Sequence, residues 1–326
     1  ALAHAFGWAL LHSLWQATLA ALILLLLLPR LKTARTRYRL AYGTLLSVLF
    51  AATVTFGLHY RFSSIGEGNA MPRSDFNTLT FNPFSSESAF DSTGLPFVSA
   101  WLESHYPLVV TLWLLGFALF LLRLAGGLWY IRRLRHEGLF LVESEWQTRL
   151  TALSERLSQS RPVALFQSAL VSAPVAIGYL KPVILLPIGL LNQLSAPEVE
   201  AVLAHELAHI ARRDWLFNLL QAFIESLFYF HPAVWWISGM VRQERENCCD
   251  DTAVALCGNP LHYAKALLRV QEMAVPVSTA RLALGLDGGV AAARPAQRRM
   301  FLLERIRRIL NQPQHKSHNM EKSIAT

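Results

Sequence analysis

Three long segments without charged residues constrain this chain more than any other feature of its sequence. Residues 1–29 are almost entirely apolar, and residues 40–60 and 104–122 contain no Asp, Glu, Lys or Arg. About 20 consecutive apolar residues are enough to cross a bilayer as an α-helix. We therefore predict three N-terminal transmembrane helices, at about residues 2–28, 40–60 and 104–130.

The composition agrees with a membrane protein. Hydrophobic residues make up 53% of the chain and charged residues only 16%, whereas a soluble domain carries about 25% charge. The net charge of +8 also fits a nucleic-acid-binding protein. The basic residues, however, flank the apolar segments, and no helix-turn-helix or zinc-finger spacing is present. We expect no direct binding of nucleic acid.

The basic residues also predict the topology. Five Lys and Arg follow the first apolar segment within 30–39, which is the reverse of the order in a cleaved signal peptide. The loop 61–103 carries five acidic and two basic residues. The positive-inside rule then predicts an outer N-terminus, an outer loop 61–103 and a C-terminal domain on the cytoplasmic side of a bacterial-type inner membrane. Reduced cysteines at 248, 249 and 257 agree with that side.

The remaining chain has a mixed pattern. We predict a transmembrane region at 1–135 and a separate domain at 136–326, which begins with a helix at 146–157. Short runs rich in Val and Ile at 163–166, 174–180 and 183–186 predict strands of a small sheet. The run 183–186 is expected at the edge of that sheet, where an extended peptide could pair with it.

A His-Glu-x-x-His pattern at 205–209 carries the chemistry. A capping box at 195–198 predicts a helix that starts near residue 196. His205 and His209 are four residues apart, so both side chains project from one helix face and can bind one zinc ion. Glu206 is placed to act on a water molecule as a general base, and then as the acid that protonates the leaving amine. The alternative is two ordinary histidines on a helix.

Zinc needs a third protein ligand, and the charged run 242–251 is the obvious source. Glu246 and Asp250 share a helix face, so Asp250 could hold a ligating histidine if Glu246 binds the metal. Glu244 is expected to face away. From spacing alone, a solvated charged face is an equally good interpretation of this run.

The apolar stretch 215–241 is long enough to cross the membrane. A single crossing would place Glu246 on the opposite side from His205 and His209. His231 and Pro232 interrupt the stretch, because proline disfavours helix at its own position and at the residue before it. We therefore predict a hairpin of two helices that brings Glu246 back. A structural role is the favoured interpretation of His231.

Several motifs together resemble the BlaR/MecR-type membrane metallopeptidases. They are Trp15, Pro-Val-Ile-Leu-Leu-Pro at 182–187, the zinc motif within 202–214, Phe-His-Pro-x-x-Trp-Trp at 230–236 and Arg-x-x-x-Glu-x-x-Cys-Asp at 242–250. The resemblance implies a mainly α membrane protein with an α+β, gluzincin-like peptidase domain. It also implies one Zn²⁺ per chain bound by His205, His209 and Glu246, with Glu206 catalytic. Asp250 matches the family's aspartate.

The resemblance further implies an integral-membrane zinc metalloendopeptidase that cuts a protein at the cytoplasmic membrane face. Signal transduction or regulated proteolysis of a transcriptional repressor is the expected setting. The expected partners are this protein or peptide substrate and the lipid bilayer. A homodimer is a further possibility. No Ser-x-x-Lys acylation motif occurs, so β-lactam sensing is not supported within this chain. The alternatives are a general quality-control metallopeptidase and a non-catalytic signal transducer.

Overall fold

Three long helices form one end of the molecule, as the apolar segments predict. The computed structural model describes residues 2–68, 95–159, 161–178, 180–273 and 295–311. The long helices are α1 (Leu2–Leu27), α2 (Ala34–Gly68) and α3 (Leu95–Leu134), with a 3-10 turn at Leu28–Arg30 after α1. Within them, Ala5–Arg30, Ala34–Arg61 and His105–Leu134 are long and apolar enough to cross a membrane. The predicted outer loop lies largely outside the described residues.

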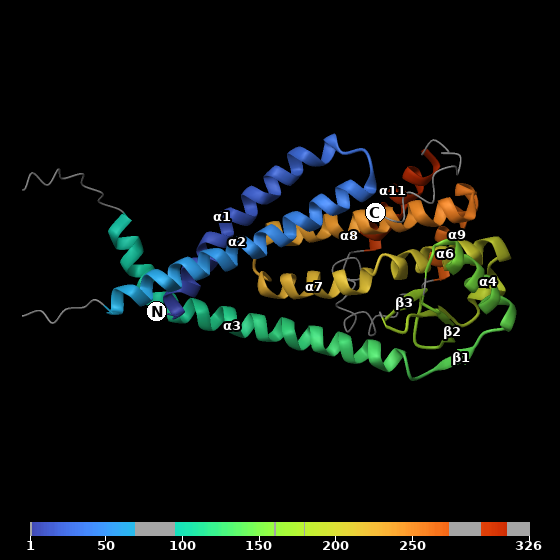
Figure 1. The fold of residues 1–326 in the computed structure, drawn as a ribbon, viewed down its shortest axis with the longest axis horizontal. Helices are drawn as coiled ribbons and strands as arrows, with labels where there is room; N and C mark the ends of the chain where they lie inside the picture. Colours follow the sequence, from blue (N-terminus) through green and yellow to red (C-terminus); the bar gives the residue numbers. More distant parts are fainter. Residues whose placement is uncertain (1, 69–94, 160, 179, 274–294, 312–326) are drawn as a thin grey trace, which may run out of the picture.

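A small four-stranded sheet lies at the other end of the molecule (Figure 1). It contains β1 (Leu139–Leu141), β2 (Ala164–Ser168), β3 (Val175–Ile177) and β4 (Val183–Pro187), and α4 (Ser144–Arg156) lies between β1 and β2 in the chain. The order across the sheet is β1-β2-β4-β3. β2 and β4 are parallel, and the outer pairs are antiparallel.

This order corrects the prediction for residues 183–186. β4 is an inner strand, paired with β2 on one side and β3 on the other. Its residues Ile184, Leu185 and Leu186 are fully buried, as expected for a strand covered on both faces. Among the described strands, β3 forms the edge on this side of the sheet, and it also contacts α6.

The following helices are α5 (Leu190–Gln193), α6 (Ala196–Ala211), α7 (Asp214–Leu227), α8 (Pro232–Cys257), α9 (Pro260–Met273) and α11 (Pro295–Asn311). The predicted capping box begins α6, since the Glu198 carboxylate accepts from the backbone N–H and the hydroxyl of Ser195, each at 2.8 Å. At the far end of α8, Gly258 has φ of 70°, a conformation in which glycine is the favoured residue.

The apolar stretch 215–241 is divided between two helices. α7 ends at Leu227, and α8 starts at Pro232 with His231 as its N-cap. His231 Nδ1 accepts from the N–H of Ala233 at 3.1 Å, so its other ring nitrogen donates toward the carbonyl oxygens of Ser13 and Leu14 on α1. This buried histidine therefore fixes the hairpin tip to the membrane helices.

α8 connects the two ends of the molecule (Figure 1). Its N-terminal half packs with α7 against α1 and α2 in one buried apolar cluster, which includes Leu45, Ile224, Val234 and Val241. Its C-terminal half reaches a second cluster formed by the sheet, α4, α6 and α9. The domain boundary near residue 135 remains a prediction. The first cluster contains residues from both sides of that position.

Candidate metal centre

α6 supplies two histidines from one helix face. His205 and His209 are four residues apart, and their Nε2 atoms lie 3.2 Å from each other. The side chain of His205 is 10% exposed and that of His209 is 20% exposed. If each ring carries its proton on Nδ1, the two Nε2 lone pairs face each other, and a cation bound between them would stabilise that arrangement.

α8 brings a carboxylate to the same point. The Glu246 oxygens lie 3.6 Å from His205 Nε2 and 3.9 Å from His209 Nε2. Two ligands at about 2.0–2.1 Å from a tetrahedral zinc ion are roughly 3.3 Å apart. The donor set and its spacing therefore fit a zinc ion. This geometry supports the prediction that Glu246 is the third ligand beside the two histidines.

The outward-facing nitrogen of His205 meets a tyrosine and an aspartate. Tyr263, on α9, has its hydroxyl 2.8 Å from His205 Nδ1 and donates to Asp250 at 2.5 Å. Asp250 itself is 3.5 Å from His205 Nδ1. Asp250 therefore reaches His205 through Tyr263, a residue that sequence reasoning missed.

The outward-facing nitrogen of His209 has a different partner. Asp214, the first residue of α7, lies 2.9 Å from His209 Nδ1. The Cys249 thiol is 3.3 Å from the same nitrogen and donates to Asp214 at 3.5 Å. Each histidine thus has Nδ1 held by its own polar group, which leaves Nε2 directed toward Glu246.

The acidic groups of this centre are poised as carboxylates. Burial opposes ionisation of Glu246, but its neighbours His205, His209 and Arg305 hold its pKa well below the usual value. Burial likewise opposes ionisation of Asp250, and the guanidinium of Arg305 lowers the pKa of Asp250 below its usual value. Both groups can therefore accept hydrogen bonds or coordinate a cation at neutral pH.

The three cysteines are free thiols. Burial raises the pKa of Cys249 to about 12 and that of Cys248 to about 11, so these groups remain protonated at neutral pH. His209, Asp214 and Cys249 also form a second group with metal-ligating atoms. That group uses Nδ1 of His209, whereas the first uses Nε2.

Glu206 follows His205 on α6 and is buried, with 8% of its surface exposed. Consecutive helical residues project about 100° apart, so Glu206 is next to the histidine pair without joining its ligand face. Glu244 faces away from the histidines, as predicted. It is fully buried, forms an ion pair with Arg37 of α2 at 3.1 Å and accepts from Asn247 at 3.0 Å.

The chain combines long apolar helices with a His-Glu-x-x-His helix and a nearby glutamate, Glu246. This combination is that of a membrane peptidase. Residues 8–293 match the family model described as BlaR1 peptidase M56. The chain therefore belongs to the BlaR1 peptidase M56 family.

Individual relatives agree with this assignment. Regulatory protein BlaR1 of Bacillus licheniformis is 28% identical over 159 residues, which cover 48% of this chain and 26% of the relative. The methicillin resistance mecR1 protein of Staphylococcus aureus is 26% identical over 109 residues, which cover 33% of this chain and 19% of the relative. Protease HtpX of Legionella pneumophila (strain Corby) is 30% identical over 117 residues, which cover 26% of this chain and 42% of the relative. This chain thus spans less than half of each of these proteins.

Proposed function

We propose that the protein is a zinc-dependent endopeptidase of the membrane. The observation that carries this proposal is the convergence of His205, His209 and Glu246, whose ligand atoms all lie within 4.8 Å of one another. Two imidazoles and one carboxylate form a donor set of catalytic zinc sites, which keep a further position open. Membership in a peptidase family supports peptide-bond hydrolysis as the reaction.

The residues of this chain divide the chemistry between them. When bound, zinc supplies a Lewis acid that lowers the pKa of water and polarises a carbonyl group. His205, His209 and Glu246 would hold the ion. Glu206 would take the proton from the attacking water and deliver it to the leaving amine. The buried position of Glu206 limits competing solvent and strengthens its electrostatic effect.

Glu206→Ala tests this division directly. We expect the variant to keep its zinc and to lose proteolysis of a protein substrate by at least about 100-fold, the usual contribution of a general base. Glu200→Ala is the matched control, because Glu200 lies on the same helix and pairs with Arg149 instead. Activity would be measured by cleavage in reconstituted membranes. Full activity in Glu206→Ala would exclude Glu206 as the base.

The edge of the sheet suggests how a substrate is held. β3 pairs only with β4 among the described strands and contacts the zinc-motif helix α6. An extended peptide could add to β3 by backbone hydrogen bonding and so reach the metal centre. This replaces the sequence-based assignment of the same role to residues 183–186.

The biological setting is proposed from the relatives. Two of them are named a regulatory protein and a methicillin resistance protein, which supports cleavage of a regulatory protein such as a transcriptional repressor. Similarity to a protein named Protease HtpX favours general membrane proteolysis as the second candidate. Comparing the proteome of cells with wild-type protein or Glu206→Ala separates these proposals, since one or two stabilised proteins support regulation and many support quality control.

A further inference from the structure

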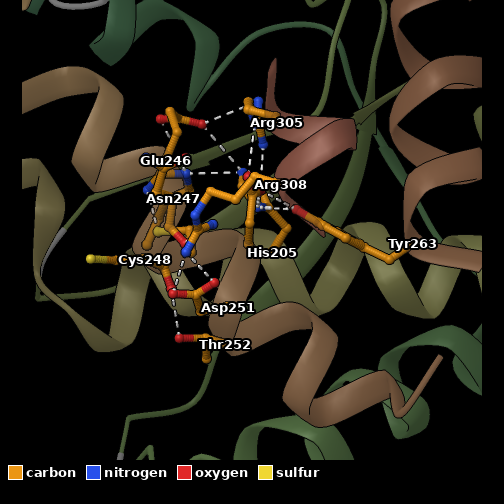
Figure 2. A network of polar contacts seen from close by, with 12 residues as sticks. His205, Glu246, Asn247, Cys248, Asp251, Thr252, Tyr263, Arg305 and Arg308 are labelled. Atoms are coloured by element: carbon orange, nitrogen blue, oxygen red, sulfur yellow. Dashed lines mark hydrogen bonds and ion pairs between the residues drawn. The ribbon is translucent and has the colours of Figure 1, made fainter. Parts of the chain in front are cut away.

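A further helix, α11, brings a positive charge to the metal centre from outside the residues matched by the family model. Arg305 of α11 is partly buried, with 13% of its side chain exposed. It donates to both oxygens of Asp250, at 2.9 Å from Nε and 2.6 Å from Nη2. Its remaining nitrogen, Nη1, lies 3.6 Å from Glu246. Figure 2 shows Arg305 directed between Glu246 and the pair formed by His205 and Tyr263.

The donors in this network impose a direction on its hydrogen bonds. A guanidinium can only donate, so Asp250 is the acceptor for Arg305. The Tyr263 hydroxyl also donates to Asp250. Its oxygen is then left to accept from the N–H at Nδ1 of His205, 2.8 Å away. The proton of the neutral imidazole therefore lies on Nδ1, and the lone pair lies on Nε2, the atom that faces His209 and Glu246.

Arg305 also separates two carboxylates. Glu246 and Asp250 are four residues apart on α8, where like charges repel each other. Asp250 is fully buried, so its charge needs a close partner. The guanidinium supplies two parallel hydrogen bonds to Asp250 and a positive charge beside Glu246. The Glu246 carboxylate thus lies 3.6 Å from the Arg305 guanidinium and 3.6 Å from His205 Nε2, between the two groups that fix its position.

We propose that Arg305 is a positioning residue for the metal centre. It fixes the hydrogen-bond direction from His205 through Tyr263 to Asp250, and it orients Glu246. This inference rests on the proposed zinc site, and it extends that site to α11, which lies beyond residues 8–293.

Arg308 provides a matched control on the same helix. It donates to both oxygens of Asp251, at 2.5 and 2.6 Å, and to the carbonyl of Asn247 at 3.1 Å. It thus joins α11 to α8 by an ion pair comparable to that of Arg305. Its partner Asp251 is 39% exposed and belongs to neither histidine network. Loss of Arg308 therefore weakens docking of α11 without changing the partners of His205.

The test is the zinc affinity of the full chain in detergent, measured by competition with a chelator. We expect Arg305→Ala to bind zinc about 10–100-fold more weakly, the usual effect of removing an outer partner of a ligand. Arg308→Ala should stay close to wild type, and Arg305→Lys should lie between wild type and Arg305→Ala. An equal loss of zinc affinity in Arg305→Ala and Arg308→Ala would show that Arg305 only docks α11. That result would overturn the proposal.

A double-mutant cycle with Tyr263→Phe identifies the route of the effect. If Arg305 acts through Tyr263, the double variant should lose about as much zinc affinity as the weaker-binding single variant. Independent losses that multiply would contradict the proposal. Arg305→Lys takes the place of Arg305→Ala in the cycle if the alanine variant does not fold. Wild-type protein without zinc would instead contradict the proposed function, so the two failures are distinguishable.

Discussion

At the scale of the residue, the two histidines of the centre are held by different kinds of partner. His205 is held through Tyr263 and Asp250, whereas His209 is held by Asp214 with the Cys249 thiol beside it. Orientation of a ligating imidazole depends on the partner of its second nitrogen. The effects of the Asp214 carboxylate and the Cys249 thiol on zinc binding can therefore be measured separately by mutating each residue.

Asp214→Ala should weaken zinc binding by about 10–100-fold, because His209 loses the carboxylate that orients its ring. Cys249→Ala should leave zinc affinity nearly unchanged, because the protonated thiol is a weak hydrogen-bonding group. Isothermal titration of both variants with zinc measures the difference. A large loss in Cys249→Ala would favour the second group of ligating atoms, formed by His209, Asp214 and Cys249.

Local patterns predicted the residues that lie on α6 and α8, because helical spacing alone places His205 with His209 and Glu246 with Asp250. Tyr263 and Arg305 could not be predicted in this way. They come from separate helices whose docking depends on tertiary packing, and neither belongs to a metal-ligand motif.

At the scale of the element, the capping box of α6 connects sequence directly to the site. Its first turn carries Ser195 and Glu198, and Arg269 of α9 pairs with the same glutamate at 2.9 Å. Capping satisfies backbone N–H groups that would otherwise lack partners. The start of the helix that carries both histidines is therefore fixed by local chemistry.

Ser195→Ala should lower the free energy of unfolding by about 1 kcal/mol, the usual cost of losing an N-cap side chain. The variant should keep its zinc, because no ligand is changed. Thermal unfolding followed by circular dichroism in detergent checks the first point, and metal analysis checks the second. An unchanged unfolding temperature would show that packing alone sets the start of α6.

Strand order was harder to predict than helix order. The apolar runs located β2, β3 and β4, but the three-residue β1 was missed because it is too short to show alternation. β4 was placed at an edge, whereas it pairs in parallel with β2 and has β3 on its other side. A run of buried residues marks a covered strand but does not say which strands flank it.

At the scale of the whole molecule, α8 links the membrane helices to the metal centre. Glu244 pairs with Arg37 at the start of α2, and Glu246 points to the histidines only two residues later. Arg37 belongs to the basic loop that the positive-inside rule assigns to the cytoplasm. This proximity supports, as a proposal, a cytoplasmic position for the centre close to the membrane surface.

Labelling of introduced cysteines tests this orientation. We expect Glu137→Cys to react with a membrane-impermeant maleimide only after cells are permeabilised, because Glu137 follows the basic end of α3. Ser86→Cys, in the predicted outer loop, should react in intact cells. The native cysteines would be replaced by alanine in both variants. The reverse labelling pattern would invert the proposed topology.

The central claim is that His205, His209 and Glu246 bind one zinc ion, and metal analysis of purified full-chain protein tests it most directly. We predict about one zinc per chain in wild-type protein and in Glu206→Ala, because Glu206 is not a ligand. Glu246→Ala should lose most of its zinc while staying folded. Well-folded wild-type protein that binds no zinc, or a Glu246→Ala variant with unchanged zinc affinity, would contradict the account.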